Sequence, residues 1–267
     1  MKKFFCLHGL PRAGNTLLGS IINQNPKVAV TSNSIVPDML GELYMLKHID
    51  VFKNFPDHKS FDNVTKSLLQ TYYKDWPQEY IIDRAPWGMP INLKFLKKVQ
   101  EDIRIVVMVR DVQEILASFI KWSQKEPTSF VNQFEAKTIE EKCDMLMKQG
   151  GQIVKELIGI KHLLDHQPKE MYHIVEYNDL CDDPKKTIEG IYDFLGIYRF
   201  NHRYTNLDQF YVNGMKYDDK IVGEGLHTIE TNSINSNNYN EFKENVNDIL
   251  PKSIIEKYNN LNFWKGK

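Results

Sequence analysis

Short apolar runs separated by longer segments of helical periodicity make up most of this chain. The apolar runs predict strands at 3–8, 28–31, 80–83, 103–109 and 171–176. The run from Ile103 to Val109 is the clearest, because continuous β-branched residues are typical of a strand buried on both faces of a parallel sheet. Apolar residues at helical spacing predict helices around 17–22, 92–99, 115–120, 138–164 and 184–195. Strands that alternate with helices favour the α/β class, with a mostly parallel, doubly wound sheet flanked by helices.

Proline and glycine mark the ends of several of these elements. The first helix is expected to end near Asn25-Pro26, because proline cannot continue a helix and restricts the residue before it. Pro184 lies in the first turn of the last long helix, and Gly196 closes that helix. Residues 33–79 carry several aromatic residues and prolines around two helical patches. We therefore expect a single domain over 1–267 with a helical insertion at about 33–79.

Composition and charge limit the classes of partner and the cellular compartment that we expect for this protein. With 34 Lys and Arg against 35 Asp and Glu, the net charge is -1, so no broad positive field attracts nucleic acid and any phosphate site must be local. Cys6, Cys143 and Cys181 are widely spaced and form no Cys/His cluster, which predicts buried free thiols in a reducing compartment and no structural zinc. No stretch approaches the ~18 to 20 apolar residues of a membrane span. We expect a cytoplasmic protein without an export signal.

A glycine-containing loop follows the first strand and opens the first helix, which is the context in which such a loop binds phosphate. It runs Gly-Leu-Pro-Arg-Ala-Gly-Asn-Thr from Gly9 to Thr16. Small residues let successive N–H groups and the helix N-terminus point at one anion, and the Arg12 guanidinium adds positive charge. The spacing equals that of the loop of ATP- and GTP-binding proteins, except that Asn15 replaces their lysine. Hydrolysis of a nucleoside triphosphate would lose a principal electrostatic contact there.

The segment Pro-Arg-Ala-Gly-Asn-Thr-Leu-Leu, with Asn-Gln-Asn-Pro at 23–26, resembles the 5′-phosphosulfate loop of sulfotransferases that use 3′-phosphoadenosine-5′-phosphosulfate (PAPS). Residues 110–112 with Ser118 look like the segment that holds the donor's 3′-phosphate in this family. The runs 175–180 and 194–196 are similar to the strand, loop and helix in which the family's tyrosine approaches the nucleotide. Residues 223–229 and 262–264 resemble the C-terminal part of bacterial and phage-like members, whereas 33–79 are unmatched.

The resemblance implies PAPS as donor and 3′-phosphoadenosine-5′-phosphate (PAP) as product. Its implied donor site comprises Arg12, Ala13, Gly14, Asn15, Thr16, Leu17, Arg110, Ser118 and Tyr177. Arg110 also has independent support, because it follows the best strand, where ligands bind in open α/β sheets, and a guanidinium with a nearby hydroxyl suits a phosphate monoester. The alternative is that Arg110 caps a carboxylate and Ser118 is an ordinary helix residue.

By analogy with phosphoryl transfer, we expect in-line sulfuryl transfer without a metal, with Arg12 and N–H groups stabilising the developing charge. Related branches have a glutamate at the position of Asn33, or a histidine just after the third strand, as the base. At that strand end this chain has Asp83-Arg84, so Asp83 is predicted to be the base and Arg84 to contact the sulfate. Asp83 is alternatively the ion-pair partner of Arg84. His227 and then His8 are the next candidates for the base.

Two other functions remain open from the residues alone. In a small-molecule kinase with this loop, Asp83 would bind Mg²⁺, whereas in a non-catalytic nucleotide-binding protein nothing would turn over. The acceptor, a small molecule, glycan, lipid or peptide with a hydroxyl or amine, is not specified by the sequence. The insertion offers aromatic residues that either line an acceptor pocket or form core, namely Tyr44, Phe52, Phe55, Tyr72, Tyr73 and Trp76.

Overall fold

Five parallel strands form one sheet in the order β2-β3-β1-β4-β5. They are β1 (Lys3–Gly9), β2 (Val28–Val30), β3 (Tyr80–Arg84), β4 (Ile105–Val109) and β5 (Tyr172–Glu176). The structure is a computed structural model that describes residues 2–229, 234 and 245–266. Every residue of β4 is buried, as the unbroken apolar run predicts for a central parallel strand.

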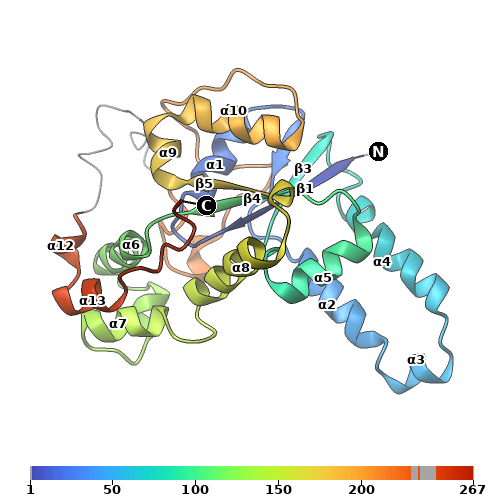
Figure 1. The fold of residues 1–267 in the computed structure, drawn as a ribbon, viewed down its shortest axis with the longest axis horizontal. Helices are drawn as coiled ribbons and strands as arrows, with labels where there is room; N and C mark the ends of the chain where they lie inside the picture. Colours follow the sequence, from blue (N-terminus) through green and yellow to red (C-terminus); the bar gives the residue numbers. More distant parts are fainter. Residues whose placement is uncertain (1, 230–233, 235–244, 267) are drawn as a thin grey trace.

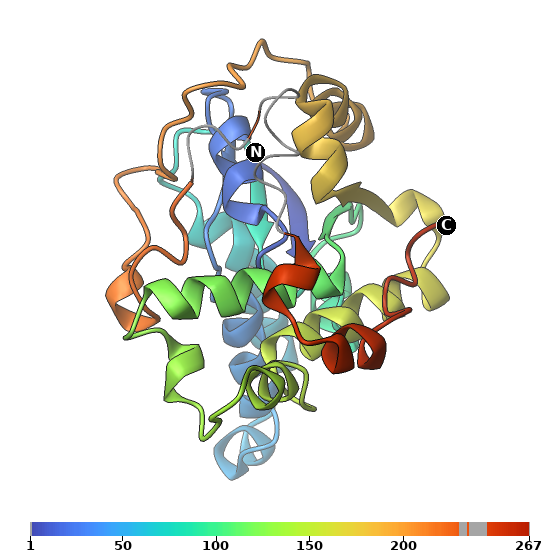
Figure 2. The same cartoon turned by 90° about the vertical axis from the view of Figure 1, so that its left-hand side faces the viewer.

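Helices cover both faces of this sheet. The α-helices are α1 (Asn15–Ile22), α2 (Val36–Leu46), α3 (Asp50–Asn54), α4 (His58–Tyr72), α5 (Pro90–Val99), α6 (Val112–Lys125), α7 (Ile139–Leu146), α8 (Gln152–His166), α9 (Tyr177–Asp182), α10 (Pro184–Leu195), α12 (Val246–Ile249) and α13 (Lys252–Lys257). Short 3-10 turns are η1 (Phe130–Gln133), η2 (Lys169–Met171) and η3 (Asp219–Ile221). Helices α1, α9 and α10 lie on one side of the sheet and α6 and α8 on the other (Figure 1, Figure 2). The predicted α/β class with a parallel, doubly wound sheet is confirmed.

The helix prediction fails at two places. The expected long helix over 138–164 is two helices, α7 and α8, because Gly150 has a φ of 81° and breaks the helical path before α8. The short helix α9, which follows β5 directly, was not predicted. It has too few apolar positions to show a helical period. The predicted end of α10 is confirmed, because Gly196 has a φ of 67° and closes the helix in the left-handed conformation.

The unmatched insertion forms an arm that projects from one end of the molecule. Helices α2, α3 and α4 make up this arm, and α3 lies at its tip (Figure 1). The tip exposes apolar side chains, since Val51 and Phe55 are each 78% exposed. The three cysteines are buried and free, as predicted from their spacing. Among the residues that the structure describes, no helix is both long and apolar enough to cross a bilayer.

Candidate active site

A cavity of about 700 Å³ opens at the carboxyl ends of the strands. Gly9 ends β1 and Arg84 ends β3, while Arg110 and Tyr177 directly follow β4 and β5, and all four line this cavity. The helices α6 and α8 and the segment 222–229 close its other sides. Its volume lies within the ~300–1,000 Å³ of ordinary ligand sites, and its position is where ligands bind in open parallel sheets.

The phosphate loop curls tightly between β1 and α1. Arg12 and Gly14 both have positive φ angles, of 59° and 83°. Glycine is required at 14 for a second reason, because a Cβ atom there would lie 2.6 Å from the ring of Tyr177. No side chain caps the N-terminus of α1, so the first amides of this helix have no capping group.

Two loop residues make hydrogen bonds within the loop, and of the two only Asn15 also lines the cavity. Ala13 is fully buried, does not line the cavity, and donates its N–H to the carbonyl of Leu10 at 3.3 Å. The predicted contact of Ala13 with the donor therefore stays a prediction. Asn15 donates its side-chain amide to the same carbonyl at 2.7 Å, so the residue that replaces the usual lysine ties the loop together.

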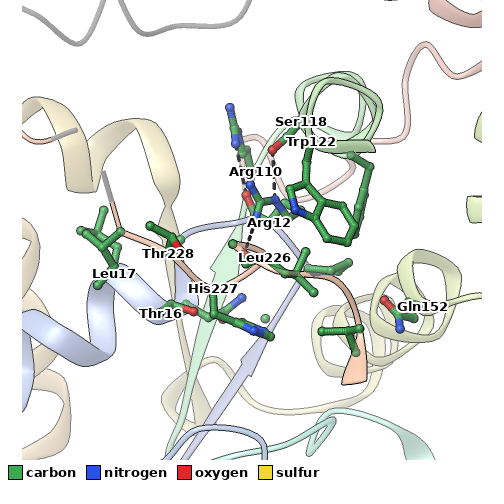
Figure 3. A pocket seen from close by; sticks show the side chains of 18 of the residues that line it. Arg12, Thr16, Leu17, Arg110, Ser118, Trp122, Gln152, Leu226, His227 and Thr228 are labelled. Atoms are coloured by element: carbon green, nitrogen blue, oxygen red, sulfur yellow. Dashed lines mark hydrogen bonds between the residues drawn. The ribbon is translucent and has the colours of Figure 1, made fainter. Parts of the chain in front are cut away.

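The Arg12 side chain reaches across to the helix that follows β4. Its Nε donates to the Ser118 hydroxyl at 3.0 Å, and Nη1 donates to the carbonyl of Leu226 (Figure 3). The phosphate loop and Ser118, which are 106 positions apart, therefore meet on one side of the cavity. The segment around Leu226 is held in turn by Trp122 of α6, which donates its indole N–H to the carbonyl of Glu224 at 3.0 Å.

Arg110 joins the same cluster and is held rigidly. Its Nε donates to the Glu114 carboxylate at 3.0 Å, where the two side chains are only 9% and 8% exposed. Its Nη1 donates to the carbonyl of Arg12 at 3.2 Å, and its guanidinium lies 4.5 Å from the ring centroid of Tyr177. Arg110 thus does pair with a carboxylate, as the alternative interpretation held, and it also faces the cavity next to the phosphate loop.

His227 lies in the cavity with one ring nitrogen held by a carboxylate. Its Nδ1 is 2.6 Å from Asp219, and its backbone N–H donates to the same carboxylate at 3.0 Å. The imidazole stacks on Tyr217 at 3.7 Å, and the Tyr217 hydroxyl accepts a hydrogen bond from Arg84 at 2.7 Å. Burial lowers the pKa of His227, and Arg84 and Arg12 lower it further, although Asp219 opposes them. Nδ1–H therefore donates to Asp219, and Nε2 keeps its lone pair at neutral pH.

The family model described as the Sulfotransferase family matches residues 5–201. The chain belongs to the sulfotransferase family. It is therefore a transferase that moves a sulfuryl group, and the predicted family membership is confirmed. No protein with a curated description matches it in sequence.

Solved structures share the fold of this sulfotransferase at low identity. The sulfotransferase domain from the curacin biosynthetic pathway has a TM-score of 0.61 and 15% identity, with 96% of this chain and 95% of that chain covered. A sulfotransferase from Alicyclobacillus acidocaldarius has a TM-score of 0.51 and 13% identity, with 76% and 85% covered. At such identities the likeness is one of fold alone.

Asp83 lies outside the cavity of this sulfotransferase. Its side chain is 1% exposed and accepts hydrogen bonds from the Tyr73 hydroxyl and from the indole N–H of Trp87, the latter at 2.8 Å. Burial raises the pKa of Asp83, although these hydrogen bonds oppose the rise. The carboxylate is thus committed to anchoring α4 and the turn after β3. Its position supports neither the predicted base role nor the Mg²⁺ site of a kinase.

The alternative ion pair between Asp83 and Arg84 is also absent from the described part of the chain. Neighbouring residues of a strand point to opposite faces of the sheet. Asp83 accordingly points into the core, whereas Arg84 points into the cavity and bonds Tyr217. His8, the last candidate for the base, is fully buried beneath the cavity and contacts Glu156 of α8.

The aromatic residues of the arm do not line this cavity. Tyr44 lines a separate cavity of about 290 Å³ between the arm and α5, together with Phe61 of α4 and Phe95 of α5. Tyr73 is core, and Phe55 is exposed. The main cavity instead has polar lining residues, among them Asn33, Arg84, Gln152, Lys155 and Glu156.

Sequence reasoning missed three residues that shape the site. Asp219 orients His227, Tyr217 joins His227 to Arg84, and Glu156 forms part of the wall. Asp219 and Tyr217 lie in a segment without periodicity, so nothing local marked them. Glu156 was one of several charged residues on a predicted helix, and only the packing of α8 against β1 singles it out.

Proposed function

We propose that this sulfotransferase takes its sulfuryl group from PAPS and transfers it in line to a hydroxyl or amine acceptor, releasing PAP. The observation that carries the proposal is the meeting of two anion sites. Arg12 of the phosphate loop bonds Ser118 at 3.0 Å, and Arg110 bonds the loop carbonyl of Arg12 at 3.2 Å. A donor with both a 5′-phosphosulfate and a 3′-phosphate needs two such sites side by side, whereas ATP needs only the first.

In this proposal each phosphate is assigned its own set of donors. The amides at the start of α1, the Thr16 hydroxyl and the Arg12 guanidinium bind the 5′-phosphosulfate. Arg110 and Ser118 bind the 3′-phosphate. Tyr177 supports both sets, because its ring lies against Gly14 of the loop and beneath the Arg110 guanidinium.

His227 acts as the general base in place of Asp83. Its Nε2 takes the proton of the acceptor hydroxyl or amine while the acceptor atom forms a bond to sulfur. The bond from sulfur to the 5′-phosphate oxygen breaks, and its electron pair leaves with PAP. Arg12 stabilises the negative charge that develops on that oxygen, and Arg84 holds the transferring group from the other side.

The donor assignment is tested by thermal unfolding with PAP, ADP and AMP. At ~100 times its dissociation constant, PAP should add roughly 2.7 kcal/mol to the free energy of unfolding. ADP lacks the 3′-phosphate and should stabilise less at the same concentration. Equal stabilisation by ADP and PAP would refute PAPS as the donor.

The base assignment is tested with His227→Gln. This variant should bind PAP normally and release PAP from PAPS roughly 10²- to 10⁴-fold more slowly, because an amide cannot accept a proton. His48→Gln is the matched control, since His48 lies on the arm after α2 and does not line the cavity. Normal turnover in His227→Gln would exclude this histidine as the base.

A further inference from the structure

Glu156 of α8 has a carboxyl oxygen that its surroundings leave unsatisfied. The side chain lines the cavity and is 21% exposed, but Oε2 is buried and, among the described residues, has no hydrogen-bond partner. Oε2 lies 3.2 Å from Nδ1 of His8. A buried carboxyl oxygen without a donor is rare in native proteins and calls for a physical explanation.

The hydrogen bonds of His8 identify that explanation. Its Nε2 lies 3.1 Å from the backbone carbonyl of Glu156, so Nε2 carries a hydrogen. The backbone N–H of Gly88 donates to Nδ1 at 3.3 Å, so Nδ1 presents a lone pair. His8 is 0% exposed, so its ring nitrogens meet only these protein partners. These contacts favour a neutral ring with its hydrogen on Nε2.

Close packing forces this ring against the helix. A Cβ atom at Gly159 would lie 2.6 Å from the His8 ring, and one at Gly88 would lie 2.9 Å from the carbonyl of Gly159. The glycines thus let α8 approach β1 until the Glu156 carboxyl meets Nδ1. Two facing lone pairs repel each other, whereas a proton on Oε2 lets the carboxyl donate to Nδ1, which then shares its one lone pair between this O–H and the longer contact from the Gly88 N–H.

The charged groups around Glu156 do not outweigh its burial. Arg84 of β3 and Lys155 of α8 favour the ionised form, as His8 of β1 would if it were charged, but burial is the larger effect and raises the pKa of Glu156. A neutral carboxyl also suits the cavity chemically. An ionised carboxylate on this wall would repel the phosphates and sulfate of the donor.

We propose that Glu156 is a neutral carboxylic acid whose proton is held by His8, and that its other oxygen positions the acceptor at the wall of the cavity. This inference rests on the proposed function, because the acceptor must approach the sulfuryl group from the side away from the phosphate loop. Gln152 lies one helical turn before Glu156. In Figure 3 it is at the right of the cavity, whereas Thr16 and Leu17 of the loop are at the left. Glu156 is thus a positioning residue, and His227 remains the base.

The protonation state is tested without any turnover. In protein labelled with ¹³C at the glutamate carboxyl carbons, the Glu156 signal is identified by its loss in Glu156→Gln. It should have the chemical shift of a protonated carboxyl at pH 7. An ionised signal at pH 7 would overturn the proposal, whether or not the protein uses PAPS.

The positioning role is tested with PAPS and water as the probe acceptor. Glu156→Gln keeps a hydrogen-bond donor toward Nδ1 and an oxygen toward the cavity, so PAP release should stay within about threefold of the parent. Glu156→Leu loses both the hydrogen-bond donor and the oxygen, so its release of PAP should be about tenfold slower than that of the parent. Glu126→Gln is the matched control, because Glu126 also lines the cavity, but hydrogen bonds from Thr128 lower its pKa and keep it ionised.

PAP affinity separates this proposal from the proposed function. All three variants should bind PAP like the parent at pH 7. Above the pH at which Glu156 ionises, PAP should bind the parent more weakly and Glu156→Gln unchanged. A loss of turnover in Glu156→Gln equal to that in Glu156→Leu would overturn the neutral role, and normal turnover in Glu156→Leu would overturn the positioning role. A parent that binds no PAP would refute the donor instead, and the ¹³C signal would still decide the protonation state.

Discussion

Replacing Arg110 should weaken PAP binding far more than AMP binding. In the proposed site Arg110 gives the 3′-phosphate a charged hydrogen bond, whose removal costs about 1.5 to 3 kcal/mol. That range corresponds to a roughly 10- to 150-fold weaker affinity for PAP. AMP lacks the 3′-phosphate, so its affinity should change by less than about threefold.

The structure shows that a single substitution would confound this measurement. Arg110 pairs with Glu114 at 3.0 Å, and both side chains are nearly buried. Removing one partner of a buried pair costs up to about 3 to 5 kcal/mol of stability and would leave a negative charge beside the donor. Arg110→Met combined with Glu114→Gln removes both charges together and should unfold close to the parent in a denaturant titration.

Calorimetric titration of the double variant with PAP and with AMP checks the prediction. Glu114→Gln alone is the control for ligand preference, because it keeps the guanidinium: it should be less stable than the parent but should still bind PAP more tightly than AMP. If the double variant folds normally and loses affinity for PAP and AMP to the same extent, Arg110 does not recognise the 3′-phosphate. The assignment of PAPS would then lose its main support.

Three further predictions follow from the site. The lowered pKa of His227 places the acid limb of kcat/KM for PAPS below pH 6.5. The free energy of unfolding should also fall as pH drops through 6.5, because His227 of the unfolded chain takes up its proton first. An acid limb of kcat/KM above pH 6.5 would contradict His227 as the base. Asp83→Asn should lower the free energy of unfolding by about 1 to 3 kcal/mol in a denaturant titration and leave PAP affinity unchanged. Weaker PAP binding at unchanged stability would show that Asp83 takes part in the binding site. Gly14→Ala should weaken PAP binding at least about tenfold in calorimetry, because a φ of 83° and the Tyr177 ring exclude a methyl group; unchanged affinity would show that the loop tolerates strain.

The proposed donor side of the cavity could be placed from the sequence because its signals are local. A strand, a glycine loop and a helix follow one another within residues 3–22, so their order alone directs the loop amides at an anion. Ser118 lies on the helix that starts directly after Arg110, and helical geometry brings such residues to one end of the sheet. Parallel strands end at the same edge, which explains why both sites meet there.

The acceptor side depended on the tertiary structure. The sequence places Asp83 and Arg84 at a strand end, but only the packing of α4 and Trp87 shows that Asp83 points into the core and Arg84 into the cavity. His227 belongs to a segment without periodicity, and Asp219 becomes its partner through the fold of that segment. Glu156 meets His8 across 148 positions because two glycines allow α8 to approach β1. Local sequence fixes the direction of backbone amides, whereas side-chain protonation depends on burial and partners that only the assembled fold supplies.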